Sequence, residues 1–184
     1  MPASPSIFAT KGDAPSIRPA GSAPAVESAL IRLALGIVLL VLIAKLFLVA
    51  HGYLELGQEG DEGARINVAA RLALEGWGDV LAFPFEKWTS IHPPGDIALR
   101  AIVLKLASGI APNATPVTIA MMLSAVLSAI GAALLIDAAR RLGGGFAALA
   151  LSILLAVSWN FHNPSLSGMG EGSVIPFFAL QIWL

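Results

Sequence analysis

The chain has 184 residues, of which 57% are hydrophobic and 12% are charged, with a mean hydropathy of +0.80. Soluble domains carry about 25% charged residues, so this composition argues against a soluble globular enzyme and against general disorder. The absence of cysteine excludes disulfides and thiolate chemistry, and a net charge of −1 gives no reason to expect a nucleic-acid partner. The composition therefore predicts an integral membrane protein.

The N-terminal segment divides into a polar tail and a first apolar helix. Residues 1–28 are rich in Pro, Ala and Ser and lack the early apolar core of a signal peptide, so we expect a disordered cytoplasmic tail. The segment 33–50 is apolar apart from Lys45 and predicts a membrane span over about residues 30–50. Lys45 lies near the end of this span, where its long side chain can extend to the interface.

A polar stretch over residues 51–94 contains a predicted amphipathic helix at 62–75. Its apolar stripe consists of Ala64, Val68, Ala69, Leu72 and Ala73. We expect Arg65, Arg71 and Glu75 to face away from this stripe. Asp61 lies at the N-terminus of the helix, where capping and the helix dipole both favour a carboxylate.

The segment 95–110 is predicted to be a helix that either crosses the membrane or lies in the interface. It has Arg100 and Lys105 near its middle, and a charge at the bilayer centre costs a few kcal/mol. Without a crossing here, the basic pair Arg140 and Arg141 falls on the cytoplasmic side with the N-terminus, as the positive-inside rule requires. The interfacial position is therefore favoured, with 62–75 and 95–110 as external helices.

Further spans are predicted at about 117–138 and 142–161, with Gly143–Gly145 as a tight turn between them. The first of these has small residues suited to close helix contact in lipid, namely Ser124, Ala125, Ser128 and Gly131. A last apolar segment, 173–184, is too short to cross, so the chain is expected to be the N-terminal part of a longer protein. The predicted fold class is all-α, a polytopic transmembrane protein with an external loop that contains amphipathic interfacial helices.

Several polar side chains in the predicted external loops could carry chemistry. Asp61 and Glu62 open a helix, which helix capping alone explains, but a carboxylate at the membrane boundary could also act as a general base or metal ligand. Glu171 lies in a glycine-rich stretch at the outer end of a span, where a carboxylate requires solvent or a partner. His92 and Lys87 are either surface residues or ligands for phosphate or, for His92, a metal.

The order of four short motifs resembles the N-terminal region of membrane-embedded GT-C glycosyltransferases. The motifs are GDEG (60–63), HPPGDIAL (92–99), RRLGGGFAALAL (140–151) and GMGEGSVIPFFAL (168–180). The pattern is most similar to family 39, the dolichyl-phosphate-mannose mannosyltransferase-like group that includes lipid A aminoarabinose transferases. Unlike the aminoarabinose transferases, this chain has its Glu-Lys pair, Glu86 and Lys87, several residues before the prolines.

The resemblance implies transfer of a sugar from a polyprenyl-phosphate donor to a glycan, lipid or protein acceptor at the external face of a bacterial inner (plasma) membrane. It implies catalytic roles for Asp61, Glu62 and Glu171. A phosphate leaving group needs a cation, and His92, Lys87 and Arg65 are the candidates. The cofactor is unidentified; a divalent metal ion is the candidate, with Glu171 and His92 as its ligands. The alternatives are a polytopic transporter and a non-catalytic membrane subunit, and the enzyme could be inactive as this fragment.

Overall fold

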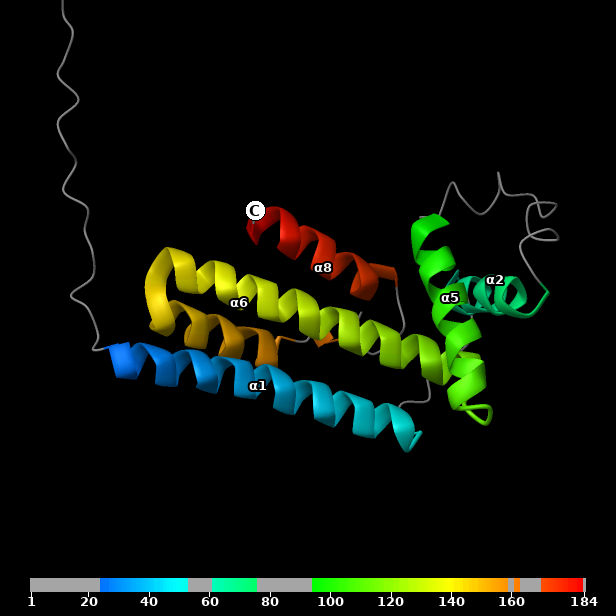
Figure 1. Ribbon diagram of the computed structural model, residues 1–184, viewed down its shortest axis with the longest axis horizontal. Helices are drawn as coiled ribbons and strands as arrows, with labels where there is room; N and C mark the ends of the chain where they lie inside the picture. Colours follow the sequence, from blue (N-terminus) through cyan, green and yellow to red (C-terminus); the bar gives the residue numbers. More distant parts are fainter. Residues whose placement is uncertain (1–23, 53–60, 76–93, 159–160, 163–169, 184) are drawn as a thin grey trace, which may run out of the picture.

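The computed structural model describes residues 24–52, 61–75, 94–158, 161–162 and 170–183, and within these ranges all regular structure is helical. The helices in chain order are α1 (Pro24–Ala50), α2 (Asp61–Glu75), α5 (Pro94–Ile110), α6 (Pro116–Val157) and α8 (Gly170–Trp183) (Figure 1). The predicted all-α class is confirmed for the described residues. α1 begins at Pro24, so residues 24–28, which we assigned to the tail, are helical.

α6 is a hairpin of two helical arms. Gly144 has φ 74° and ψ −168°, a conformation that is essentially restricted to glycine, and it separates residues 116–143 from 145–157. The second arm runs back beside the first arm and packs on α1 as well (Figure 1). A Cβ atom on Gly145 would lie 3.1 Å from Leu30 Cβ, so the turn packs closely on the start of α1. The predicted turn at Gly143–Gly145 is therefore confirmed.

Replacing Gly144 with alanine is expected to lower the free energy of unfolding by about 1–3 kcal/mol, the cost of holding a side chain in this backbone region. An added Cβ would meet no atom within 4 Å, so the effect would come from the backbone alone. Gly36→Ala is the matched control, because Gly36 is an exposed helical glycine with the same open space. Reversible unfolding in detergent measures both variants; equal stabilities would contradict the strain at Gly144.

Small residues fill the interior of the bundle, and large apolar residues cover its outside. The four small residues predicted to make helix contacts, Ser124, Ala125, Ser128 and Gly131, are all buried. A Cβ on Gly131 would lie only 2.6 Å from Ile175 Cγ2, so α8 packs against α6 almost backbone to backbone. In contrast, Leu40 on α1 is 68% exposed. Close contact through small residues is typical of helices packed in lipid.

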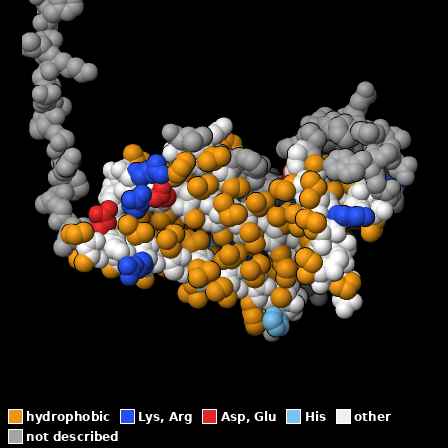
Figure 2. All heavy atoms as spheres, in the orientation of Figure 1, with side chains coloured by type: hydrophobic (Ala, Val, Ile, Leu, Met, Phe, Trp, Pro, Cys, Tyr) orange, Lys and Arg blue, Asp and Glu red, His pale blue; other side chains and the backbone are white. Residues whose placement is uncertain are grey.

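Two of the described helices, α1 and α6, are long and apolar enough to cross a membrane. Figure 2 shows a largely apolar surface over the middle of the molecule, with charged side chains towards its two ends, most of them where α1 begins and α6 turns. An apolar surface of this kind is unfavourable in water. The arrangement therefore favours a membrane protein.

α2 and α5 form a separate layer at the other end of the bundle. Their shared core contains Ala69, Leu72, Ala73, Ile97, Ala101 and Leu104. The predicted helices at 62–75 and 95–110 are thus confirmed as helices. α5 runs across the end of α6, not alongside it (Figure 1). This orientation differs from that of the two candidate spans.

Candidate functional site

The helix ends that carry the predicted catalytic acids lie at one end of the bundle. α1 ends there and α8 begins there, on the side of the bundle where α5 lies, whereas the second arm of α6 ends before it reaches this end (Figure 1). Contacts agree with this arrangement, since Lys45 near the end of α1 lies 5.1 Å from the centre of the Phe161 ring. At the opposite end, Trp183 in the last turn of α8 donates a hydrogen bond from Nε1 to Asp137 Oδ2 at 2.7 Å.

The three predicted catalytic acids lie in the first turns of two helices at this end. Asp61 and Glu62 are the first residues of α2, and Glu171 is the second residue of α8. Their side chains are outside what the structure describes, so their mutual distance stays a prediction. Lys87 and His92 also lie outside the described residues. Within the described part of the chain, no group of three potential metal ligands occurs, and the predicted ligands Glu171 and His92 do not belong to that part as side chains.

Arg65 lies on the packed face of α2, contrary to the prediction that it faces away. Arg65 is only 8% exposed, and the neighbouring Ile66 is 4% exposed. Arg65 is four residues before Ala69 and seven before Leu72, so helical periodicity places all three on one face. The long aliphatic part of an arginine can pack on apolar neighbours, which the polarity-based prediction did not take into account. Arg71 is exposed, as predicted.

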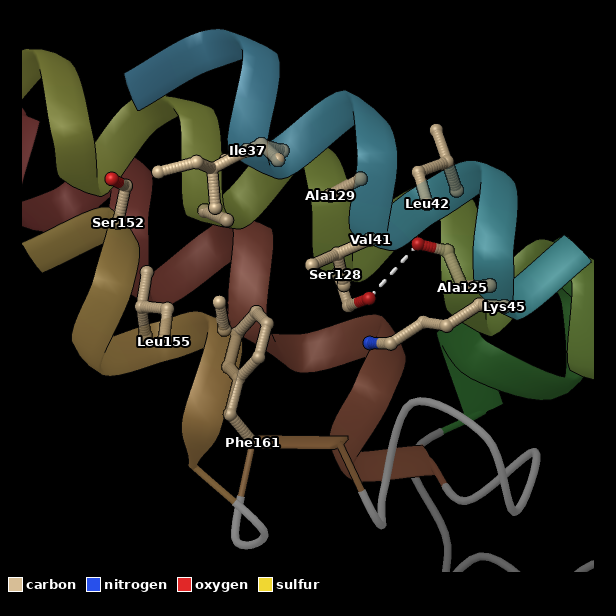
Figure 3. Close-up of a pocket in the computed structure, with 13 residues that line it drawn as sticks. Ile37, Val41, Leu42, Lys45, Ala125, Ser128, Ala129, Ser152, Leu155 and Phe161 are labelled. Carbon is tan, nitrogen blue, oxygen red and sulfur yellow. Dashed lines mark hydrogen bonds between the residues drawn. The ribbon is translucent and has the colours of Figure 1, made fainter. Parts of the chain in front are cut away.

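Lys45 points into the bundle, so the prediction that it extends to the interface was wrong. The residue is 4% exposed and faces a narrow cavity between α1 and the two arms of α6 (Figure 3). Val41, Ser128 and Phe161 line the cavity with it, and the remaining lining is mostly aliphatic. A basic group buried beside an apolar cavity is costly unless it serves a partner or a function.

The two serines that line this cavity bond to their own helix. Ser128 Oγ donates to the Ala125 carbonyl at 2.9 Å, and Ser152 Oγ donates to the Leu149 carbonyl at 2.7 Å. A hydroxyl that donates in this way keeps oxygen lone pairs that can accept a further hydrogen bond. Ser128 and Ser152 therefore add weak acceptors, but no charge, to the wall around Lys45.

Arg100 connects α5 to the same part of α6. Arg100 is 1% exposed. Its Nε donates a hydrogen bond at 2.9 Å to Oδ2 of Asp96, which lies one turn earlier on α5. Its Nη2 lies 3.4 Å from Ser124 Oγ, while Nη1 is buried without a hydrogen-bond partner among the described groups. Ser124 and Ser128 are one helical turn apart, so Arg100 and Lys45 approach neighbouring turns of α6.

The ion pair changes the argument about whether α5 crosses the membrane. Asp96 compensates the charge of Arg100, so of the two basic residues on α5 only the exposed Lys105 opposes a crossing. The orientation of α5 across the end of α6 is now the stronger support for an interfacial helix.

Lys45 and Arg100 are basic residues that the sequence reasoning did not consider as site residues. The spacing of Asp96 and Arg100, four residues apart on a helix, is a recognisable signal for an ion pair. Lys45 gave a weaker signal, as a single charge in an apolar span. Together with Arg65, they are three buried basic side chains on the helices of this end, of which Arg100 is already paired with Asp96.

Comparison with protein-family models, with curated proteins and with solved structures found no match to this chain.

Proposed function

We propose that this chain forms part of a multi-pass membrane glycosyltransferase that transfers a sugar from a polyprenyl-phosphate donor to an acceptor at the external face of a bacterial inner membrane. The observation that carries the proposal is the position of two helix starts at one end of the bundle. The first turn of α2, with Asp61 and Glu62, and the first turn of α8, with Glu171, lie at the same end (Figure 1). Acids at opposite ends could not act on one substrate.

The charge distribution supports this orientation in the membrane. Arg32, Arg140 and Arg141 belong to the opposite end, where α1 begins and α6 turns. Short segments rich in arginine and lysine stay on the cytoplasmic side. The N-terminus is then cytoplasmic, and the end with α2, α5 and the start of α8 is external.

The proposed reaction needs one base and one group that accepts negative charge. The acceptor hydroxyl attacks the anomeric carbon, the bond from that carbon to the phosphate oxygen breaks, and the hydroxyl proton passes to a carboxylate, for which Asp61 is our candidate. The polyprenyl phosphate leaves with the bonding electron pair. Groups that stabilise this developing charge lower the barrier.

The buried basic residues are the described candidates for this second role, and Arg100 would act there together with its partner Asp96. Arg65, Arg100 and Lys45 are 8%, 1% and 4% exposed, and a charge in such surroundings acts more strongly than one in water. His92 and Lys87 remain further candidates for the phosphate, and a divalent metal at Glu171 and His92 remains a candidate for the same task. A donor with a lipid tail would explain why such a site lies at the boundary of the bilayer.

The test is sugar transfer in membranes that contain the natural protein. Radiolabelled polyprenyl phosphates with mannose, glucose, arabinose or aminoarabinose are supplied in turn, and label in non-donor material is measured against membranes that lack the protein. We expect incorporation from one donor class. If every donor stays intact while the protein is present and folded in the membrane, the proposal is wrong.

The buried Lys45 also favours a second candidate, transport. Transporters use ionisable residues inside the bundle to bind substrates or protons, and Lys45 faces a cavity between helices. Purified protein in liposomes would then move a charged solute or a proton across the bilayer, and Lys45→Met would stop this flux. A glycosyltransferase would show no such flux.

A further inference from the structure

A groove lies between the start of α1 and the turn of α6, at the end opposite to the candidate site. It is lined by Pro24, Glu27, Ser28, Ile31, Arg32 and Arg140. The groove thus joins two elements that are more than 100 residues apart in the sequence. The same end includes Asp137 and Arg141, so three arginines there face two carboxylates.

The arginines of this groove have donor groups that make no hydrogen bond with the residues that the structure describes. Asp137 accepts from Arg140 Nε at 2.8 Å and from Arg141 Nε at 2.9 Å, and it also accepts from Trp183. The terminal nitrogens of Arg140 make no hydrogen bond within the described part of the chain, and its side chain is 38% exposed. Arg32 is exposed and makes no ion pair with any residue that the structure describes.

Large apolar side chains adjoin the arginines. Leu142 is 87% exposed, Phe146 is 67% exposed, and Leu33 next to Arg32 is 54% exposed. The Trp183 ring lies 4.4 Å from the Arg141 guanidinium and adds an aromatic group of the kind common at membrane interfaces. Charged donors beside exposed apolar groups match a ligand with an anionic head and apolar chains.

We propose that this groove binds the phosphate of an anionic phospholipid, with Arg32 and Arg140 as the main contacts. Two guanidinium groups whose terminal nitrogens have no hydrogen-bond partner among the described residues can hold phosphate oxygens in paired hydrogen bonds. Basic grooves between membrane helices on the cytoplasmic side bind such head groups, and each basic residue contributes about 1 kcal/mol. The proposal requires insertion in a membrane but does not depend on glycosyl transfer.

The experiment compares lipid retention by the purified full chain in detergent, measured by native mass spectrometry. The protein is incubated with equal amounts of phosphatidylglycerol and phosphatidylcholine, both with oleoyl chains. We expect preferential retention of phosphatidylglycerol, with Arg32→Gln lowering it about fivefold and the double variant with Arg140→Gln lowering it further. Arg32→Gln should fold normally because Arg32 is exposed. Lys105→Gln, which removes an exposed charge on α5, is the matched control.

Each outcome decides the proposal. Retention that depends on Arg32 and not on Lys105 supports the groove. Equal retention of the two lipids, or an equal loss in Lys105→Gln, overturns it. A further arm adds inorganic phosphate at a large excess over lipid. If phosphate alone displaces phosphatidylglycerol completely, the groove is a site for a free anion and the lipid proposal is wrong.

Discussion

Asp61→Asn is expected to lower sugar transfer at least about 100-fold, because an amide cannot take the proton of the acceptor hydroxyl. Asparagine is about as good as aspartate at a helix N-terminus, and the loss of charge near the helix dipole costs only about 0.3–1 kcal/mol. α2 should therefore persist. Transfer from the active donor is measured at saturating donor, together with the thermal stability of the variant.

Glu27→Gln is the matched control, because Glu27 lies in the first turn of α1 at the opposite end of the bundle. Its transfer rate should equal that of the natural protein. If Asp61→Asn retains its activity, Asp61 is only a helix-terminal residue and another group is the base. A loss of activity that matches a loss of folded protein would lead to the same conclusion.

Asp96→Ala is expected to lower the free energy of unfolding by about 3–5 kcal/mol, since it leaves Arg100 buried without its charge partner. Arg100 is 1% exposed, and its other contact, from Nη2 to Ser124 Oγ, is long at 3.4 Å. The layer formed by α2 and α5 should loosen first, because Arg100 lies between α5 and α6. Unfolding in detergent, with proteolysis at α2 and α5 as a local probe, measures the effect.

The double variant Asp96→Leu, Arg100→Met is the control for this prediction. Replacing both members of a buried ion pair with apolar residues of similar size is often neutral or stabilising. Recovery of stability in the double variant would show that the unpaired charge causes the loss. If Asp96→Ala alone has no effect, the charge of Arg100 is compensated elsewhere and the pair is not needed for the fold.

The presence of each helix in the described chain was predictable from hydrophobic patterning and turn residues, but the predicted span 142–161 is longer than the second arm of α6, which ends at Val157. The turn at Gly143–Gly145 stood out because three glycines and two arginines interrupt apolar sequence. The small residues from Ser124 to Gly131 correctly marked the packed face of α6. The start of α1 was placed a few residues late, because residues 24–28 have mixed polarity and a helix can continue beyond the hydrocarbon region.

The directions of individual side chains were the part that the sequence did not determine. α1 is apolar on all sides, so its sequence has no amphipathic pattern that indicates which face packs. The inward position of Lys45 follows only from the contact of α1 with α6. Arg65 was predicted to face away from the packed side because arginine is charged, although its spacing of four residues from Ala69 places it on the packed face. The candidate acids lie in first turns of helices, and patterning locates such turns without orienting their side chains.

The glycine turn in α6 also has a consequence for the surrounding lipid. The second arm, residues 145–157, is about 20 Å long at 1.5 Å per residue, roughly 10 Å less than the hydrocarbon core of a bilayer. Such hydrophobic mismatch is relieved by thinning of the bilayer, by flanking side chains that extend to the interface or by association of helices. The shortfall lies where Leu155, Ala156 and Phe161 border Lys45. Thinning of the bilayer beside this arm would bring the membrane surface closer to the buried Lys45.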